Sequence, residues 1–202
     1  MASLPRASDR YEPFTRSPLR RPGRRVNLRA NCVNVRQTFM RSFAGVVAAI
    51  TLNIASAAAP NITGQAAPDF ALRTLEQSNL RLSEFRGQVV LINFWASWCG
   101  ACRQAMPIFN EMQEKYRQAG LVMLSINVDD EAHRALHMAQ SLKIRFPVLL
   151  DEQKVVSRLY QLETMPLTVL IDREGTVRFV HVGYNVGDDT KFVAPLRSLL
   201  NE

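Results

Sequence analysis

The pattern of apolar and polar positions predicts a β-hairpin followed by a buried strand at the start of the folded region. Residues 69–85 alternate apolar and polar side chains on both sides of the polar run 76–79, as the two arms of a hairpin do. Residues 89–95 are apolar on both faces except at Asn93, which is typical of a strand in the middle of a sheet.

Two amphipathic helices are predicted after this strand. Apolar residues recur at steps of three and four along the first helix, which runs to residue 119, and Gly120 ends that pattern. The second helix is expected to begin at a cap provided by Asp129 or Asp130 and to run to Leu142. The side chains expected to face inward from the second helix are Ala132, Ala135, Leu136, Ala139 and Leu142.

The remaining elements complete an α/β order. Further strands are expected at residues 121–128, 146–151, 167–172 and 176–182. A short helix is expected at residues 154–162, and a last helix begins at Asp188 or Asp189. Because alternating strands and helices are followed by a hairpin and a helix, the sequence predicts an α/β fold with a central mixed β-sheet flanked by helices on both faces.

The positive charge of the chain is confined to its N-terminal part. The whole chain has a formal charge of +7, yet residues 1–59 hold ten arginines, no lysine and two acidic residues. Residues 60–202 hold 15 basic and 16 acidic residues and are therefore close to neutral. This balance gives no support to an electrostatic nucleic-acid footprint on the folded region.

Residues 40–59 have the order of features found in a signal peptide. Met40 and Arg41 give a positive start, an apolar stretch follows from Phe43, and small residues precede Pro60. We expect cleavage after these small residues and export of the rest of the chain. An uncleaved membrane anchor is the second interpretation, and an organelle transit peptide is the third.

These features divide the chain into three parts. Residues 1–59 are expected to be the basic leader, residues 60–66 a small polar linker, and residues 67–202 the folded domain. The expected location of the domain is periplasmic or otherwise extracytoplasmic, with a membrane tether through the leader as the second choice.

Cys99 and Cys102 are the cysteines that remain once the leader, which contains Cys32, is removed. A disulfide across two residues removes little chain entropy, so the value of this pair is chemical. Cys99 lies where a strand gives way to a helix, and the unpaired N–H groups and positive dipole end of a helix stabilise a thiolate. Cys102, one turn further along, is placed to attack a mixed disulfide formed on Cys99.

The residues beside the cysteines fit the same chemistry. Gly100 and Ala101 leave the surface near the sulfur atoms uncluttered, and Trp98 provides a wall. A zinc site is disfavoured because such sites need about four ligands and the chain has no second cysteine pair. His133 and His137 are expected on the solvated face of their helix, and His181 in a strand where packing or an exposed edge accounts for it.

Two segments resemble the thioredoxin superfamily. FWASWCGAC at residues 94–102 and TMPLTVLIDREG at residues 164–175 are most similar to its exported TlpA-like branch, the ResA-type thiol–disulfide oxidoreductases with a redoxin domain. The resemblance implies a thioredoxin-like fold with an N-terminal β-hairpin, an extra strand–helix insertion and no cofactor. It also implies that Pro166 is a cis-proline facing the disulfide, with the backbone of Met165 pairing with a client strand.

Two positions bear on the proton chemistry of this site. Small thioredoxins have a buried aspartate behind the second cysteine, whereas this chain has Asn93, as is usual in the TlpA-like branch. Many members of that branch have glutamate three residues after the second cysteine, whereas this chain has Ala105. The motif therefore supplies no evident general base for the second thiol.

The expected function is that of an exported thiol–disulfide oxidoreductase that reduces protein disulfides, with the haem-site cysteines of apocytochrome c among its candidate clients. Expected partners are protein disulfide or dithiol clients and a membrane thiol donor, and the chain is expected to be a monomer that binds neither metal nor nucleic acid. A peroxiredoxin-like thiol peroxidase is an alternative, although Ala96 stands where a hydroxyl residue would be expected. A copper chaperone is a second alternative, although its relatives space their cysteines by three residues.

Overall fold

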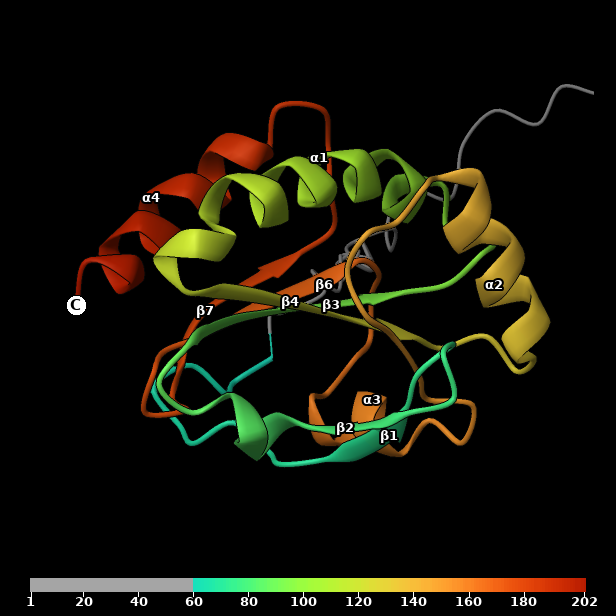
Figure 1. Ribbon diagram of the computed structural model, residues 1–202, viewed down its shortest axis with the longest axis horizontal. Helices are drawn as coiled ribbons and strands as arrows, with labels where there is room; N and C mark the ends of the chain where they lie inside the picture. Colours follow the sequence, from blue (N-terminus) through green and yellow to red (C-terminus); the bar gives the residue numbers. More distant parts are fainter. Residues whose placement is uncertain (1–59) are drawn as a thin grey trace, which may run out of the picture. The chain divides into compact units, whose positions relative to one another are not determined.

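The computed structural model describes residues 60–202, which form a sheet with helices packed on it (Figure 1). The expectations for the leader, residues 1–59, including its signal peptide and Cys32, lie outside the described residues.

The central sheet is mixed, with strand order β5-β4-β3-β6-β7. Its strands are β3 (Val89–Trp95), β4 (Leu121–Asn127), β5 (Val148–Leu150), β6 (Leu167–Ile171) and β7 (Val177–Val182). Strand β3 pairs in parallel with β4 and antiparallel with β6, and all seven of its residues are buried. Burial on both faces explains why the sequence of β3 does not alternate.

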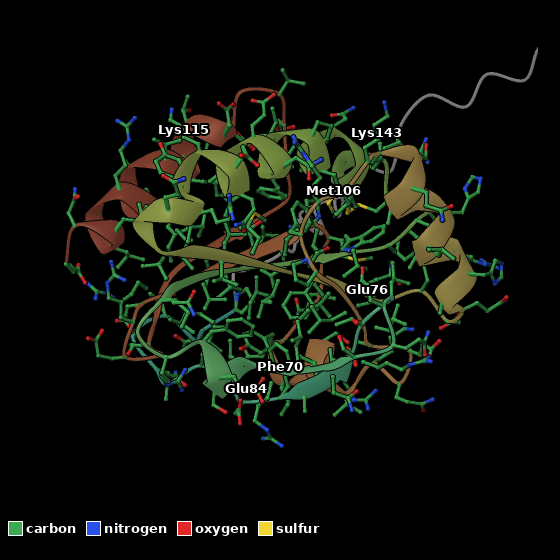
Figure 2. The ribbon with its side chains drawn as sticks, viewed as in Figure 1. Phe70, Glu76, Glu84, Met106, Lys115 and Lys143 are labelled. Carbon is green, nitrogen blue, oxygen red and sulfur yellow. A yellow bond between two sulfur atoms is a disulfide. The ribbon has the colours of Figure 1, made fainter. Side chains whose placement is uncertain are left out.

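Helices cover both faces of this sheet (Figure 1), which confirms the predicted fold class. The helices are α1 (Gly100–Tyr116), α2 (Ala132–Ser141), α3 (Val155–Leu159) and α4 (Asp189–Leu200). Helices α1 and α4 lie on one face, α3 lies on the other, and α2 lies beside β5. Figure 2 shows Met106, which is fully buried, between α1 and the sheet. Among these helices of residues 60–202, none combines the length and the apolar character needed to cross a membrane.

The predicted hairpin is present on the face opposite α1. Its strands β1 (Ala71–Arg73) and β2 (Asn79–Arg81) are antiparallel, and a 3-10 turn, η1 (Leu82–Phe85), follows them. The backbone N–H of Leu75 donates to the carbonyl of Val148 at 3.0 Å, so the hairpin also extends the edge of the sheet at β5.

The segment expected to be a linker, residues 60–66, is attached to the domain instead. The side chain of Ile62 is 4% exposed, and the N–H of Gly64 donates to the carbonyl of Val177 at 2.7 Å. The N–H of Val177 donates in turn to the carbonyl of Gln65 at 2.9 Å. A polar composition suggested a free segment, but one buried isoleucine and these backbone hydrogen bonds hold it against the start of β7.

The start of α2 also differs from the prediction. The N-cap residue is Glu131, and no side chain makes a capping hydrogen bond there. Asp130 instead pairs with Lys154 at 2.8 Å, and Asp129 is bound elsewhere, as described below. Leu136, expected to face inward, is 43% exposed, because the buried stripe of this short helix consists of alanines.

Candidate active site

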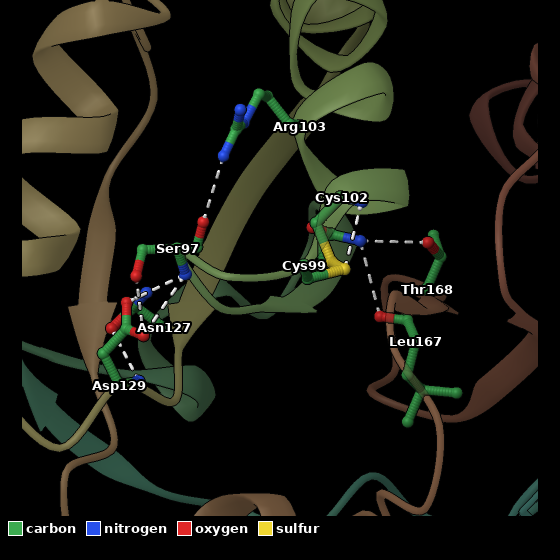
Figure 3. Close-up of a disulfide and its surroundings, with 9 residues drawn as sticks. Ser97, Cys99, Cys102, Arg103, Asn127, Asp129, Leu167 and Thr168 are labelled. Atoms are coloured by element: carbon green, nitrogen blue, oxygen red, sulfur yellow. Dashed lines mark hydrogen bonds between the residues drawn. A yellow bond between two sulfur atoms is a disulfide. The ribbon is translucent and has the colours of Figure 1, made fainter. Parts of the chain in front are cut away.

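A disulfide joins Cys99 to Cys102 at the point where β3 gives way to α1 (Figure 3). Cys99 is the N-cap residue of α1 and has an extended backbone, with φ −82° and ψ 106°. Its sulfur atom accepts a hydrogen bond from the backbone N–H of Cys102 at 3.1 Å. Cys99 therefore takes the capping position that serine or aspartate occupies in many helices, with sulfur as the acceptor.

The two cysteines differ in their access to solvent. Cys99 is 8% exposed, whereas Cys102 is 0% exposed. Trp98 projects into solvent with 68% of its surface exposed, and a side chain at Gly100 would meet no atom within 4 Å. Ala101 is half-buried against the core. An incoming disulfide can thus reach Cys99 across an open surface but cannot reach Cys102.

The structure places the predicted proline segment at the start of β6. The Met165–Pro166 peptide bond is cis, as the resemblance implied, and Pro166 is buried while Met165 is half-buried. Leu167 follows and pairs in register with Phe94 of β3, so this segment enters the sheet on the strand next to the one that leads to the cysteines.

Asn93 links β3 to β6 within the buried core. Its side-chain amide donates to the hydroxyl of Thr168 at 3.1 Å and to the carbonyl of Leu167 at 3.5 Å. Its side-chain oxygen is buried and makes no hydrogen bond within the described part of the chain. Because its amide is neutral, Asn93 adds no charge behind the disulfide, in contrast to the aspartate of small thioredoxins.

Asp129 is a site residue, whereas the sequence predicted it as a candidate N-cap of the second helix. Its carboxylate is 3% exposed and accepts hydrogen bonds from the backbone N–H of Ser97 at 3.0 and 3.2 Å and from the Ser97 hydroxyl at 3.0 Å (Figure 3). It also accepts from the side-chain amide of Asn127 at 2.8 Å. These bonds fix the loop that carries Trp98 and Cys99. The sequence feature that could have indicated this role is the pair of adjacent aspartates, Asp129 and Asp130, because only one of them could cap the helix.

The histidines lie outside the disulfide site. His133 is exposed, with its Nδ1 atom 3.0 Å from Glu131, and His137 is exposed on the same helix. Within residues 60–202, no group of three or more histidine, cysteine or acidic side chains is arranged to hold a metal ion. His181 packs edge-on against Phe192 with ring centres 5.1 Å apart, as expected for a packing role.

The Asp188 carboxylate, 3.4 Å from His181, has its pKa lowered to about 2. The side-chain hydrogen bond from Lys191 is the largest cause, and the backbone N–H of Asn185 adds to it. A lowered carboxyl pKa stabilises the fold above the unfolded value of about 3.9, and this contribution is lost as the pH falls towards 2. Asp188 and the groups that hydrogen-bond to it therefore anchor the start of α4 at neutral pH. They have no part in thiol chemistry.

A mixed sheet of this topology, with a CxxC disulfide at the start of the first long helix and a cis-proline directly before the adjacent strand, defines a thioredoxin-like thiol–disulfide oxidoreductase. The sequence model of the AhpC/TSA family matches residues 63–180, and the chain belongs to this family within the thioredoxin superfamily.

Known proteins of the same class are similar to the chain. Thiol-disulfide oxidoreductase ResA of Geobacillus thermodenitrificans is 35% identical over 128 residues, which cover 63% of this chain and 74% of the relative. Thioredoxin-like protein YneN of Bacillus subtilis is 34% identical over 123 residues, covering 59% and 71% of the two chains.

Solved structures agree with this assignment. A Chlorobium tepidum protein assigned as a thiol:disulfide interchange protein, DsbE, has a TM-score of 0.66 and 37% identity, covering 68% of this chain and 97% of its own. A Bacteroides thetaiotaomicron protein assigned as a protein disulfide isomerase has a TM-score of 0.64 and 30% identity, covering 69% and 91% of the two chains.

The hydrogen bonds of Asp129 lead to a prediction about stability. Asp129→Ala removes the acceptor of the half-buried Ser97 donors and of the buried Asn127 amide, and we expect it to lower the free energy of unfolding of the oxidised protein by about 2–3 kcal/mol. Urea denaturation followed by tryptophan fluorescence measures this. Asp130→Ala removes the neighbouring, fully exposed carboxylate and is the matched control, with little change expected. Equal midpoints for the two variants would show that the Asp129 contacts do not hold the loop.

Proposed function

We propose that the protein reduces disulfides in protein clients, with Cys99 as the attacking thiol and Cys102 as the resolving thiol. The observation that carries this proposal is the different solvent access of the two cysteines. Cys99 caps α1 and retains some contact with solvent, whereas Cys102 is fully buried one turn further along. The N–H groups at the helix start stabilise the Cys99 thiolate, which is the reactive form.

The exchange proceeds in two steps. The Cys99 thiolate attacks one sulfur atom of the client disulfide; a Cys99–client bond forms, the client S–S bond breaks, and the released client thiolate takes a proton. Cys102 then loses its proton and attacks Cys99, which forms the Cys99–Cys102 disulfide and releases the second client thiol. Two electrons pass from the protein to the client, and a thiol donor returns them to the protein in a separate exchange.

The residues around Cys99 would position the client. Trp98 offers an exposed aromatic surface, and Gly100 and Ala101 leave the approach open. The backbone of Met165, beside Pro166, would pair with an extended client segment across the disulfide. These contacts would hold the client sulfur in line with Cys99 during attack.

The proposal extends to the place of action. We infer that residues 1–59 direct export and that the domain works outside the cytoplasm as a monomer, with a membrane thiol donor as its reductant. Clients include proteins with exposed disulfides and, by resemblance to the ResA-type proteins, apocytochromes c whose haem-site cysteines must be reduced. The peroxidase alternative expects a hydroxyl residue three positions before the reactive cysteine, and it receives no support there, because that residue is Ala96, which is buried and has no hydroxyl.

Trapping of the mixed disulfide tests the proposed roles. Cys102→Ser removes the resolving thiol, so we expect the reduced variant to accumulate covalent adducts with disulfide-containing proteins, and peptide mapping to place each adduct on Cys99. Cys99→Ser is the matched control and is expected to form few adducts, because Cys102 is buried. Adducts that formed mainly through Cys102 would reverse the assignment.

Ala105 gives a second prediction, since it is fully buried one turn beyond Cys102. Ala105→Glu places a carboxyl group near the thiols, and its negative charge opposes thiolate formation, so the macroscopic thiol titration of the reduced pair should move upward by about one pH unit. Titration of thiolate absorbance measures this shift.

Ala105→Gln is the control for the size of the new side chain. Both variants should lose stability from overpacking, by about 1–3 kcal/mol. Only the glutamate variant should shift the titration, and identical curves for the two variants would mean that this position does not affect the proton chemistry of the cysteines.

A further inference from the structure

A groove of about 510 Å³ opens beside the disulfide, between the start of α1 and helix α2. Its lining includes Ser97, Arg103, His133, Arg134, His137 and Met138. The volume falls within the range of ligand-binding pockets in proteins. The resemblance assigned no role to this groove, and the exchange mechanism above does not use it.

Two residues that line the groove flank the redox cysteines in the sequence. Ser97 comes two residues before Cys99, and Arg103 comes directly after Cys102. The guanidinium group of Arg103 lies 3.5 Å from the carbonyl oxygen of Ser97, on the loop that Asp129 fixes (Figure 3). A client chain bound by its cysteine at Cys99 would therefore pass close to these side chains.

The groove carries more positive than negative charge, although the domain as a whole is close to neutral. In the described part of the chain Arg103 forms no ion pair, and its side chain is exposed. Arg134 and His133 share one carboxylate, Glu131, at 3.4 and 3.0 Å. The buried carboxylate of Asp129 is already occupied by its hydrogen bonds to the loop and to β4.

We infer that this groove binds acidic side chains of the client that flank its reactive cysteine. An arginine without a carboxylate partner, next to the redox pair, can make the two parallel hydrogen bonds that a client carboxylate accepts. Arg134 and His137 add donors further along α2, so a segment with two or more acidic residues fits better than one with a single charge. This inference rests on the proposed function, because it names a preference among protein clients.

Two disulfide peptides test the inference with the full chain. They are identical except for two positions beside the cysteine, which are glutamate in one peptide and glutamine in the other, and the measured quantity is the second-order rate constant of their reduction. We expect the glutamate peptide to react about threefold to tenfold faster at low salt. The ratio should approach one at about 0.5 M salt, where exposed charges are screened.

Variants identify the groove as the source of this ratio. Arg103→Gln should bring the ratio at low salt to within about twofold of one. Arg117→Gln, which removes the same charge directly after the far end of α1, should leave the ratio unchanged. The leader carries the same charge in every variant, and using a ratio removes any effect of the substitution on the cysteines themselves.

The outcomes separate this inference from the proposed function. Equal rates for the two peptides with wild-type protein, or an unchanged ratio in Arg103→Gln, would overturn the groove while leaving disulfide reduction intact. Failure of the reduced protein to act on either peptide would overturn the proposed function and the groove with it. A glutamate preference that is lost in Arg103→Gln and kept in Arg117→Gln would support both.

Discussion

The site depends on a single junction, where the buried strand β3 ends and α1 begins at Cys99. Strand β3 is held on both sides by β4 and β6, and all of its residues are buried, so the position of its end is fixed by the core. The N–H of Cys102 donates to the sulfur of Cys99 at 3.1 Å, which makes this sulfur itself the cap of the helix. The same hydrogen bond that begins the helix thus supports negative charge on Cys99.

The surroundings of this junction separate charge from the buried thiol. Asn93 and Ala105, the two positions where relatives place carboxyl groups, are neutral here and fully buried. The charged groups have other places: the buried carboxylate of Asp129 bonds to the preceding loop, and the exposed Arg103 directly follows Cys102. We therefore propose that the start of the helix activates Cys99 and that the groove at Arg103 selects clients, with no buried carboxylate sharing protons with the cysteines.

The sequence was sufficient for those features that follow from local pattern. The extent of β3 and the hairpin were predicted, because burial on both faces and alternation leave clear signals. Gly120 was correctly predicted as the stop of the helical segment, although α1 itself ends at Tyr116 and a 3-10 turn, residues 117–119, fills the gap. The features that depend on tertiary contacts were not predictable in this way. Asp129 has the sequence position of a helix cap, yet its carboxylate accepts hydrogen bonds from a loop more than thirty residues earlier. Residues 60–66 have the composition of a linker, yet Ile62 is buried in the domain. The groove brings together residues of α1 and α2, and the spacing of these residues in the sequence does not indicate that they lie close together.

The most direct test of the account is the pH dependence of alkylation of the reduced protein, with each labelled cysteine identified by mass. Brief exposure to limiting iodoacetamide should label Cys99 well before Cys102, and the rate at Cys99 should rise with a midpoint below the usual thiol pKa of about 8.5. A midpoint at or above about 8.5, or faster labelling of Cys102, would contradict the claim that the start of α1 activates Cys99.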